Sequence, residues 1–427
     1  MSGLLVAAEW LFLAGVALVP VMQPWSGDAL GAVVIPADVC FVAAGVCWLV
    51  PLVRARLAPL RGWFPLAAMA YLAALVVAAL ASPTRRDSLE RVVVDAYVVG
   101  IGLLAFGLSD SARRREHLAR AWLVGTALTV TAALVGVALF YGGRRTPDEN
   151  FAVAVIGSVP TDDYPRVRGL FLNANMFCGF LIAGLLFALA VLGTRRRASW
   201  IAFGAIAVVI VLTFSPGIGG AILAVALWCS LAFHDRWPER TRRIVLGAGA
   251  FGAVGFIVLA GTVGPRGGTW SDALETFVDH PFDGVGPGNA VAATVHDGSF
   301  FVDAHSAWLN VAGQAGLLGL LGFTAVIATV CVPAWRARPL ARLLEPVRAG
   351  WCAFVGAVLF VSLTMSLEQT RYAWVLLGAV AGWLSARTDQ HQRGALAGHS
   401  LGGSTTSSPP RKGWSTSGTR KEPSGCW

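Results

Sequence analysis

Long apolar runs separated by short arginine-rich segments form the pattern along this chain. A helix rising about 1.5 Å per residue needs about 20 residues to cross a bilayer, and the runs have that length. Twelve of them lie near 4–22, 30–53, 63–81, 89–109, 118–141, 170–193, 198–214, 217–233, 243–262, 305–332, 348–367 and 371–386. The stretch over 198–233 counts as two helices because Ser215-Pro216-Gly217 interrupts it. The pattern predicts an all-α, polytopic membrane protein of about twelve transmembrane helices.

Composition supports this fold class. Apolar residues make up 56% of the chain and charged residues 13%, whereas soluble domains carry about a quarter charged residues. A net charge of +9 would suit nucleic acid, but the arginines cluster between apolar runs, as in cytoplasmic membrane loops. We therefore expect a lipid bilayer and no nucleic acid among the partners.

The basic residues predict the orientation of the chain. With the N-terminus in the cytoplasm, 24 of the 33 lysine and arginine residues fall in inner loops or the C-terminal tail. We expect a transmembrane domain over 1–386, both termini in the cytoplasm, and a disordered cytoplasmic tail over 387–427. Two long loops, 142–169 and 263–304, then face outward, the second between helices nine and ten.

The second loop contains a predicted short helix. Trp270, Leu274, Phe277 and Val278 share one helical face, and Pro281 ends the pattern. Such a helix would lie on the membrane surface or cover a cavity beneath it.

Two arginines and two asparagines stand at the outer start of the sixth predicted helix. Arg166 and Arg168 could bind phosphate oxygens bidentately. Asn173 and Asn175 enter the membrane and need polar partners, either a neighbouring helix or a substrate. Interfacial anchoring and helix–helix hydrogen bonding are the structural alternative.

A histidine opens the tenth predicted helix on the same side. His305 can change its charge near neutral pH, which suits a general base, although a histidine at a helix end can also be structural. The nearby histidines and acids match no strong ligand spacing, so we expect no metal site. Two acids, Asp38 and Asp95, lie in the outer halves of their helices, where they could line a cavity or pair with a site arginine.

Several motifs in order resemble the O-antigen ligase and O-antigen polymerase (Wzy-type) superfamily of bacterial membrane glycan transferases. Arg-x-x-Gly-x-Phe-x-x-x-Asn stands at 166–175, and Trp-x-x-Ala-Leu followed by Pro-Phe-x-Gly-x-Gly stands at 270–286. A histidine before Gly-Leu-Leu-Gly spans 305–319, and Arg-Tyr-Ala-Trp begins at Arg371. The likeness covers most of the chain up to about Ala386.

The resemblance implies a function. Members transfer a glycan from a polyprenyl diphosphate carrier to a glycan or glycolipid acceptor at the outer face of the bacterial cytoplasmic membrane. Carried onto this chain, Arg168 and Arg266 would bind the diphosphate, with Arg166 or Arg371 supplying a further cation, and His305 would activate the acceptor. We expect an inverting transfer that needs no metal or other cofactor.

Two departures from the family pattern bear on activity. Ser306 stands where the family usually has Asn after the histidine, and Ser215-Pro216-Gly217 lacks the arginine commonly found at that turn. A secondary transporter and a non-catalytic polysaccharide export or assembly partner are the alternative functions. Ligase and polymerase members share this layout, so the product, the sugar and the acceptor are left open.

Overall fold

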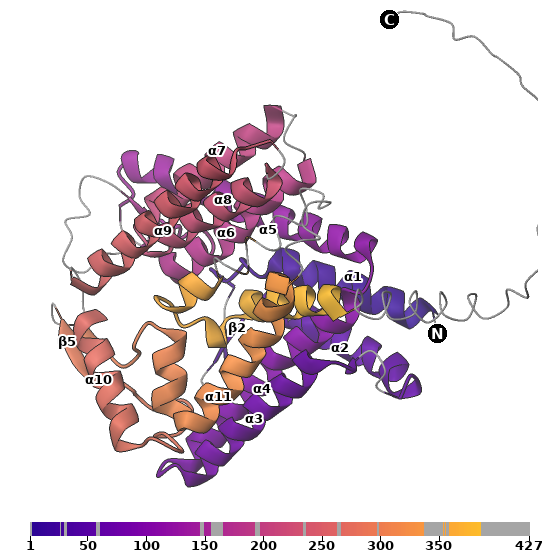
Figure 1. Cartoon of the computed structure of the whole chain (residues 1–427), viewed down its shortest axis with the longest axis vertical. Coiled ribbons are helices and arrows are strands. Elements are labelled where there is room, and N and C mark those ends of the chain that lie inside the picture. Colours follow the sequence, from indigo (N-terminus) through magenta and orange to yellow (C-terminus); the bar gives the residue numbers. More distant parts are fainter. Residues whose placement is uncertain are drawn as a thin grey trace, which may run out of the picture. The chain divides into compact units, whose positions relative to one another are not determined.

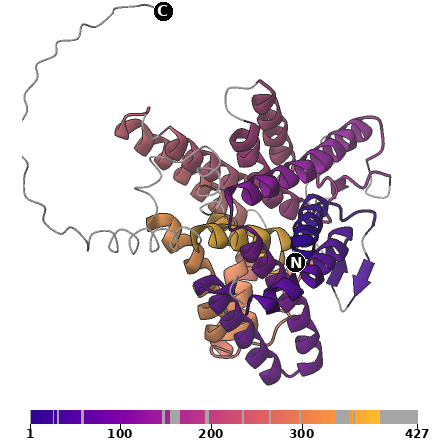
Figure 2. The same cartoon turned by 90° about the vertical axis from the view of Figure 1, so that its right-hand side faces the viewer.

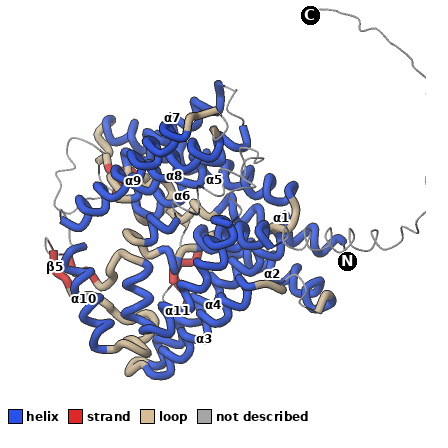
Figure 3. The backbone as a smooth tube through the Cα atoms, viewed as in Figure 1, coloured by secondary structure: helices blue, strands red, loops and turns tan. Residues whose placement is uncertain are grey.

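Helices make up most of the described chain, and its strands are confined to short segments (Figure 3). The computed structural model describes residues 2–25, 27–29, 32–56, 60–145, 149–154, 165–192, 197–233, 236–262, 266–296, 299–336, 353, 355 and 358–385. These residues belong to one compact unit, Met1–Ala386. The tail predicted to be disordered, 387–427, lies outside the described residues.

The helices follow the predicted runs along the chain. They are α1 (Ser2–Leu18), α2 (Pro36–Arg54), α3 (Trp63–Ala81), α4 (Arg85–Leu108), α5 (Ala112–Tyr141), α6 (Ala174–Leu192), α7 (Arg197–Leu212), α8 (Gly217–Ala232), α9 (Glu239–Thr262), α10 (Arg266–Asp279) and α11 (Ala307–Arg336). Helical residues also occupy 358–362 and 371–385, and a 3₁₀ turn, η3 (Leu367–Gln369), lies between these two segments.

Three antiparallel hairpins, absent from the sequence prediction, lie between the helices. They pair β1 (Gly27–Ala29) with β2 (Ala32–Val34), β3 (Val153–Ala154) with β4 (Arg166–Val167), and β5 (Thr294–His296) with β6 (Ser299–Phe301). The first hairpin joins α1 to α2, which pack against each other (Figure 2).

Five of the described helices are long and apolar enough to cross a membrane, namely α2, α3, α4, α5 and α11. Four shorter ones, α1, α6, α7 and α8, are also apolar. The all-α class is confirmed, as is the division of 198–233 into two helices. The count of twelve, the long outer loops and the orientation stay predictions, in part because most of 337–357 lies outside the described residues.

The predicted helix in the second loop exists as α10. It buries Thr269 and Ala273, while Leu274 and Val278 on the other side are exposed. Trp270, from the same predicted face, packs instead against Ala273, Val291 and Ala304, so only part of the apolar face points away from the protein.

The predicted continuous helix over 305–332 is wrong: α11 is broken at Gly316. This residue has φ 58°, outside helical geometry, and a Cβ there would collide with the backbone of Phe282. In a straight helix, Trp308 and Phe323 would lie about 22 Å apart, but their ring centroids are separated by 5.2 Å. The segment 307–315 therefore folds back against the rest of α11.

Glycines set the close approach of the helices around the centre of the fold. The long helix α3 packs against α4 on one side and α11 on the other (Figure 1). The helix over 371–385 crosses α4 through Gly378 and Gly382, which face the carbonyl oxygens of Gly102 and Phe106. Glycines four residues apart let membrane helices bring their backbones together.

Replacing Gly378 with alanine is therefore expected to separate this helix from α4. The added methyl group would meet the Gly102 carbonyl, which cannot rotate away as a side chain could. We expect a loss of at least about 1–3 kcal/mol, measured as a lower unfolding midpoint in detergent. Gly100→Ala on α4 is the control, because nothing lies within 4 Å of its Cβ position. Equal midpoints for the two variants would contradict the close crossing.

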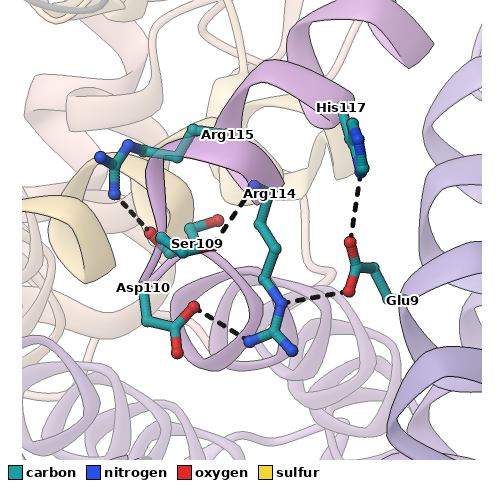
Figure 4. Close-up of polar contacts among 7 residues, drawn as sticks. Glu9, Ser109, Asp110, Arg114, Arg115 and His117 are labelled. Atoms are coloured by element: carbon teal, nitrogen blue, oxygen red, sulfur yellow. Dashed lines mark hydrogen bonds and ion pairs between the residues drawn. The ribbon is translucent and has the colours of Figure 1, made fainter.

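A polar cluster fastens α1 to the start of α5 (Figure 4). Glu9 accepts a hydrogen bond from Arg114 at 3.1 Å and lies 3.4 Å from the His117 ring nitrogen. Arg114 also reaches Asp110 at 2.9 Å, and Arg115 donates to the Ser109 carbonyl. The basic segment before the fifth predicted helix is thus part of α5 and holds a neighbouring helix in place.

Candidate functional site

A cavity of about 330 Å³ lies where α4 meets the turns that precede α6, α11 and the helix over 371–385. Val33, Val94, Val98, Met176 and Met365 form its apolar wall. Its polar lining residues are Arg91, Asn173, Asn175, Asp303, His305, Thr364, Ser366, Gln369, Thr370 and Arg371. The fold therefore brings four predicted site residues together: His305, Arg371, Asn173 and Asn175.

His305 is held by the turn in front of α11. Its backbone is left-handed, with φ 50°, and its amide donates to Asp303 Oδ1 at 2.5 Å. The same carboxylate oxygen lies 4.0 Å from His305 Nδ1. Few residues other than glycine adopt this backbone conformation without cost, so the turn fixes the imidazole at the cavity wall. A carboxylate beside the ring would also stabilise an imidazolium.

Asp303 is itself fixed by a partly buried hydrogen-bond network. Ser366 Oγ donates to Asp303 Oδ2 at 2.7 Å, and Asn310 Nδ2 donates to Asp303 Oδ1 at 2.8 Å. Asn310 also donates to Glu368 Oε1 at 3.0 Å, which links the two acids. Neutral hydrogen-bond donors thus hold the Asp303 carboxylate beside the imidazole ring of His305.

Glu368 in η3 lies directly behind this network. Burial, with a further contribution from the charge of Asp303, raises the pKa of Glu368 to about 8. Burial therefore favours the neutral carboxyl group of Glu368 over its carboxylate.

The two asparagines play different parts. Asn173 Oδ1 accepts from the amide of Asn175 at 2.6 Å at the start of α6, a local bond of the kind that caps helices. Asn175 Oδ1 accepts from Arg166 Nη2 at 3.3 Å. Arg166 also donates to the Thr213 carbonyl at 3.1 Å, so it joins the turn between α7 and α8 to the cavity wall.

Arg168 points to its own loop. Its guanidinium donates to the carbonyl oxygens of Phe151, at 2.8 Å, and Leu172, at 3.3 Å. Burial lowers the pKa of both Arg166 and Arg168, although a guanidinium stays protonated at any physiological pH. Neither is among the cavity-lining residues, and the diphosphate-binding role of each stays a prediction.

Arg371 is paired with a predicted acid. It donates to Asp38 Oδ1 at 2.6 Å and to Oδ2 at 2.8 Å, and it also reaches the Val33 carbonyl. Tyr97 donates to the same carboxylate at 2.6 Å. Asp38 thus pairs with Arg371, while a substrate-binding role for either residue stays a prediction. Arg371 therefore lines the cavity with its charge already balanced.

The turn where the family commonly has an arginine is closely packed. A Cβ at Gly217 would lie 2.8 Å from Cys178 Sγ, and the Gly217 amide donates to Ser215 Oγ. A long side chain at Gly217 would need this contact to open. Arg266 begins α10, but its side chain lies outside the described residues.

Arg91 was not among the predicted site residues, although it lines the cavity beside the predicted acid Asp95. Arg91 Nε lies 3.8 Å from Asp95 Oδ1, one helical turn away on α4. The sequence signal was an arginine and an aspartate four residues apart at the start of an apolar run. In the part of the chain that the structure describes, no three His, Cys, Asp or Glu side chains gather closely enough for a metal.

Two comparisons with known proteins bear on this site. Residues 182–324, which run from α6 into α11, match the O-antigen ligase family model. An O-antigen ligase from Pseudomonas aeruginosa is 26% identical over 183 residues, which cover 40% of this chain and 44% of the relative. The chain thus spans less than half the length of that relative. Both matches agree with the ordered motifs and the apolar helices, so the chain is similar to O-antigen ligases over its central part.

Proposed function

We propose that this protein transfers a glycan from a polyprenyl diphosphate carrier to an acceptor sugar at the outer face of the cytoplasmic membrane. The single observation that carries the proposal is the shared cavity. It combines a histidine backed by a carboxylate, two asparagines and arginine side chains with an apolar wall. A substrate with a sugar, a diphosphate and a hydrocarbon tail needs polar groups for the sugar, cations for the diphosphate and an apolar surface for the tail, all side by side.

In the proposed reaction, His305 takes the proton from the acceptor hydroxyl group. The acceptor oxygen attacks the anomeric carbon, the bond from that carbon to the diphosphate oxygen breaks, and its electron pair leaves with the carrier diphosphate. Attack from the opposite side inverts the anomeric centre. Asp303 stabilises the imidazolium, since it lies 4.0 Å from Nδ1 and is held by neutral donors.

Arginines stabilise the charge that develops on the leaving diphosphate. Guanidinium groups can do this without a metal ion, so the proposal includes no metal or other cofactor. Arg266, Arg168, Arg166 and Arg371 keep the diphosphate role that the family resemblance implies.

A reconstituted transfer assay tests this function. Purified protein in detergent or liposomes would receive a lipid diphosphate-linked oligosaccharide and a glycolipid or glycan acceptor. We expect glycan to appear on the acceptor with release of carrier diphosphate, and the new linkage to have the inverted anomeric configuration by NMR. Gradient-dependent uptake of a solute into vesicles without transfer would favour the transporter. Binding of the lipid-linked glycan without turnover on any acceptor would favour the assembly partner.

A further inference from the structure

Arg91 enters the cavity with an unmet hydrogen-bonding capacity. Its Nε is buried and has no hydrogen-bond partner in the described chain. The Asp95 carboxylate lies 3.8 Å away, close enough for attraction but too far for a hydrogen bond. A buried guanidinium left in this state costs free energy that an anionic ligand could recover.

The other cavity arginine differs in this respect. Asp38 holds Arg371 through two hydrogen bonds of 2.6 and 2.8 Å. An anion approaching Arg371 would compete with a carboxylate already in place. At Arg91 it would instead meet the guanidinium of a side chain that is 19% exposed and holds its nearest carboxylate only at 3.8 Å, so the two arginines are not equivalent as ligands.

The glycine-rich segment after α10 fixes the stem of Arg91. Gly288, with φ 83°, places its backbone so that an added Cβ would lie 3.2 Å from Arg91 Cβ and Cγ. Asn289 fastens this segment, since it donates to Ser82 Oγ at 3.1 Å and to the Val285 carbonyl at 2.7 Å. A side chain clamped along its stem loses less freedom when its end binds a ligand.

The wall below Arg91 favours a lipid. Val94 and Val98 follow Arg91 at the i+3 and i+7 positions of α4, and all three line the cavity. Along one face of α4, the cation of Arg91 is thus followed by the apolar side chains of Val94 and Val98. A polyprenyl diphosphate has this same order of anion and hydrocarbon.

We propose that Arg91 binds the diphosphate of the polyprenyl carrier, with the first isoprene units lying along Val94 and Val98. This deepens the proposed function and rests on it. Arg91 would supply a cation in a chain that lacks the arginine of the family pattern at Ser215-Pro216-Gly217.

Direct binding to the purified full-length protein in detergent tests this assignment. The probe is farnesyl diphosphate, followed by intrinsic tryptophan fluorescence. We expect Arg91→Gln to weaken its binding by about tenfold or more, and Arg91→Lys, which keeps the charge without the fork, to weaken it less. The matched control is Arg86→Gln on α4, because that side chain is 90% exposed and should leave binding unchanged.

Gly288→Ala is a second variant that alters no charge. Its methyl group would press on the Arg91 stem and strain the backbone at φ 83°, so weaker binding in a folded variant with a somewhat lower melting temperature is expected. This variant keeps the assignment testable if Arg91→Gln fails to fold. Unchanged affinity in Gly288→Ala together with Arg91→Lys would overturn it.

Competition experiments distinguish a lipid diphosphate from a free diphosphate and from a phospholipid headgroup. Inorganic pyrophosphate should bind more weakly than farnesyl diphosphate and lose affinity by a similar factor in Arg91→Gln, while phosphatidylglycerol micelles should not compete. Equal affinity for pyrophosphate, or displacement by phosphatidylglycerol, would overturn the lipid diphosphate assignment. Farnesyl diphosphate binding that depends on Arg91, in a protein that transfers no glycan, would support the site and contradict the proposed function.

Discussion

Replacing His305 with alanine is expected to slow glycan transfer by about 10²–10⁴-fold, the usual contribution of a general base. The imidazole lines the cavity, and no other described histidine does so. Without it, the acceptor hydroxyl group would have to lose its proton to water or to Asp303, whose carboxylate is held by Ser366 and Asn310. The measurement is the initial rate of transfer by purified variants of equal melting temperature.

His280→Ala is the matched control for this experiment. His280 follows α10 in the same segment between α9 and α11, but it is exposed and does not line the cavity. We expect its rate to equal that of the wild type. A folded His305→Ala variant that also transfers at the wild-type rate would rule out the base role. A loss of donor binding rather than of turnover would indicate that His305 only shapes the cavity.

The positions of most described helices could be predicted because the length of each apolar run determines where a helix can form. Runs of about 20 apolar residues have few alternatives to a helix in a membrane, since every backbone polar group must be paired. The break in α11 could not be predicted in this way. Gly316 stands in an apolar run that continues on both sides, and the hydropathy of the run is unaffected by the reversal.

Part of the candidate site could also be predicted from the apolar runs, because polar residues at their ends stand out. His305, Asn173 and Asn175 stand out as polar groups at the starts of apolar helices, and the cavity includes them. The network behind His305 depends on Asn310, Ser366 and Glu368, which meet only when residues about 60 positions apart come together. A single sequence does not show which residues far apart along the chain come into contact. It also gave no reason to choose Arg91 above the other outer arginines.

The partner of Arg371 was predicted only as a class. Asp38 was expected to pair with some site arginine, but Arg371 lies 333 positions further along the chain. The position of β2 completes the arrangement, because the Val33 carbonyl accepts a third hydrogen bond from Arg371. The first hairpin and the last described helix are thus joined beside the cavity.

Breaking this pair is expected to produce the largest loss of stability. The two side chains are 14% and 10% exposed, so Asp38→Ala would leave a guanidinium buried without its counter-ion and would also release Tyr97. Removal of one partner of a buried ion pair costs about 3–5 kcal/mol. We expect a marked fall in the unfolding midpoint of the purified protein in detergent, and a similar fall for Arg371→Ala.

The exposed pair Arg86–Glu90 on α4 provides the control, with side chains that are 90% and 41% exposed. Glu90→Ala should change stability by at most about 1 kcal/mol, because water screens the interaction. The double variant Asp38→Leu/Arg371→Leu should recover much of the loss, since hydrophobic residues need no counter-ion. If Asp38→Ala were as stable as Glu90→Ala, the Asp38–Arg371 pair would not contribute to stability. Arg371 would then be as free as Arg91 to meet a diphosphate, and the distinction between the two cavity arginines would fail.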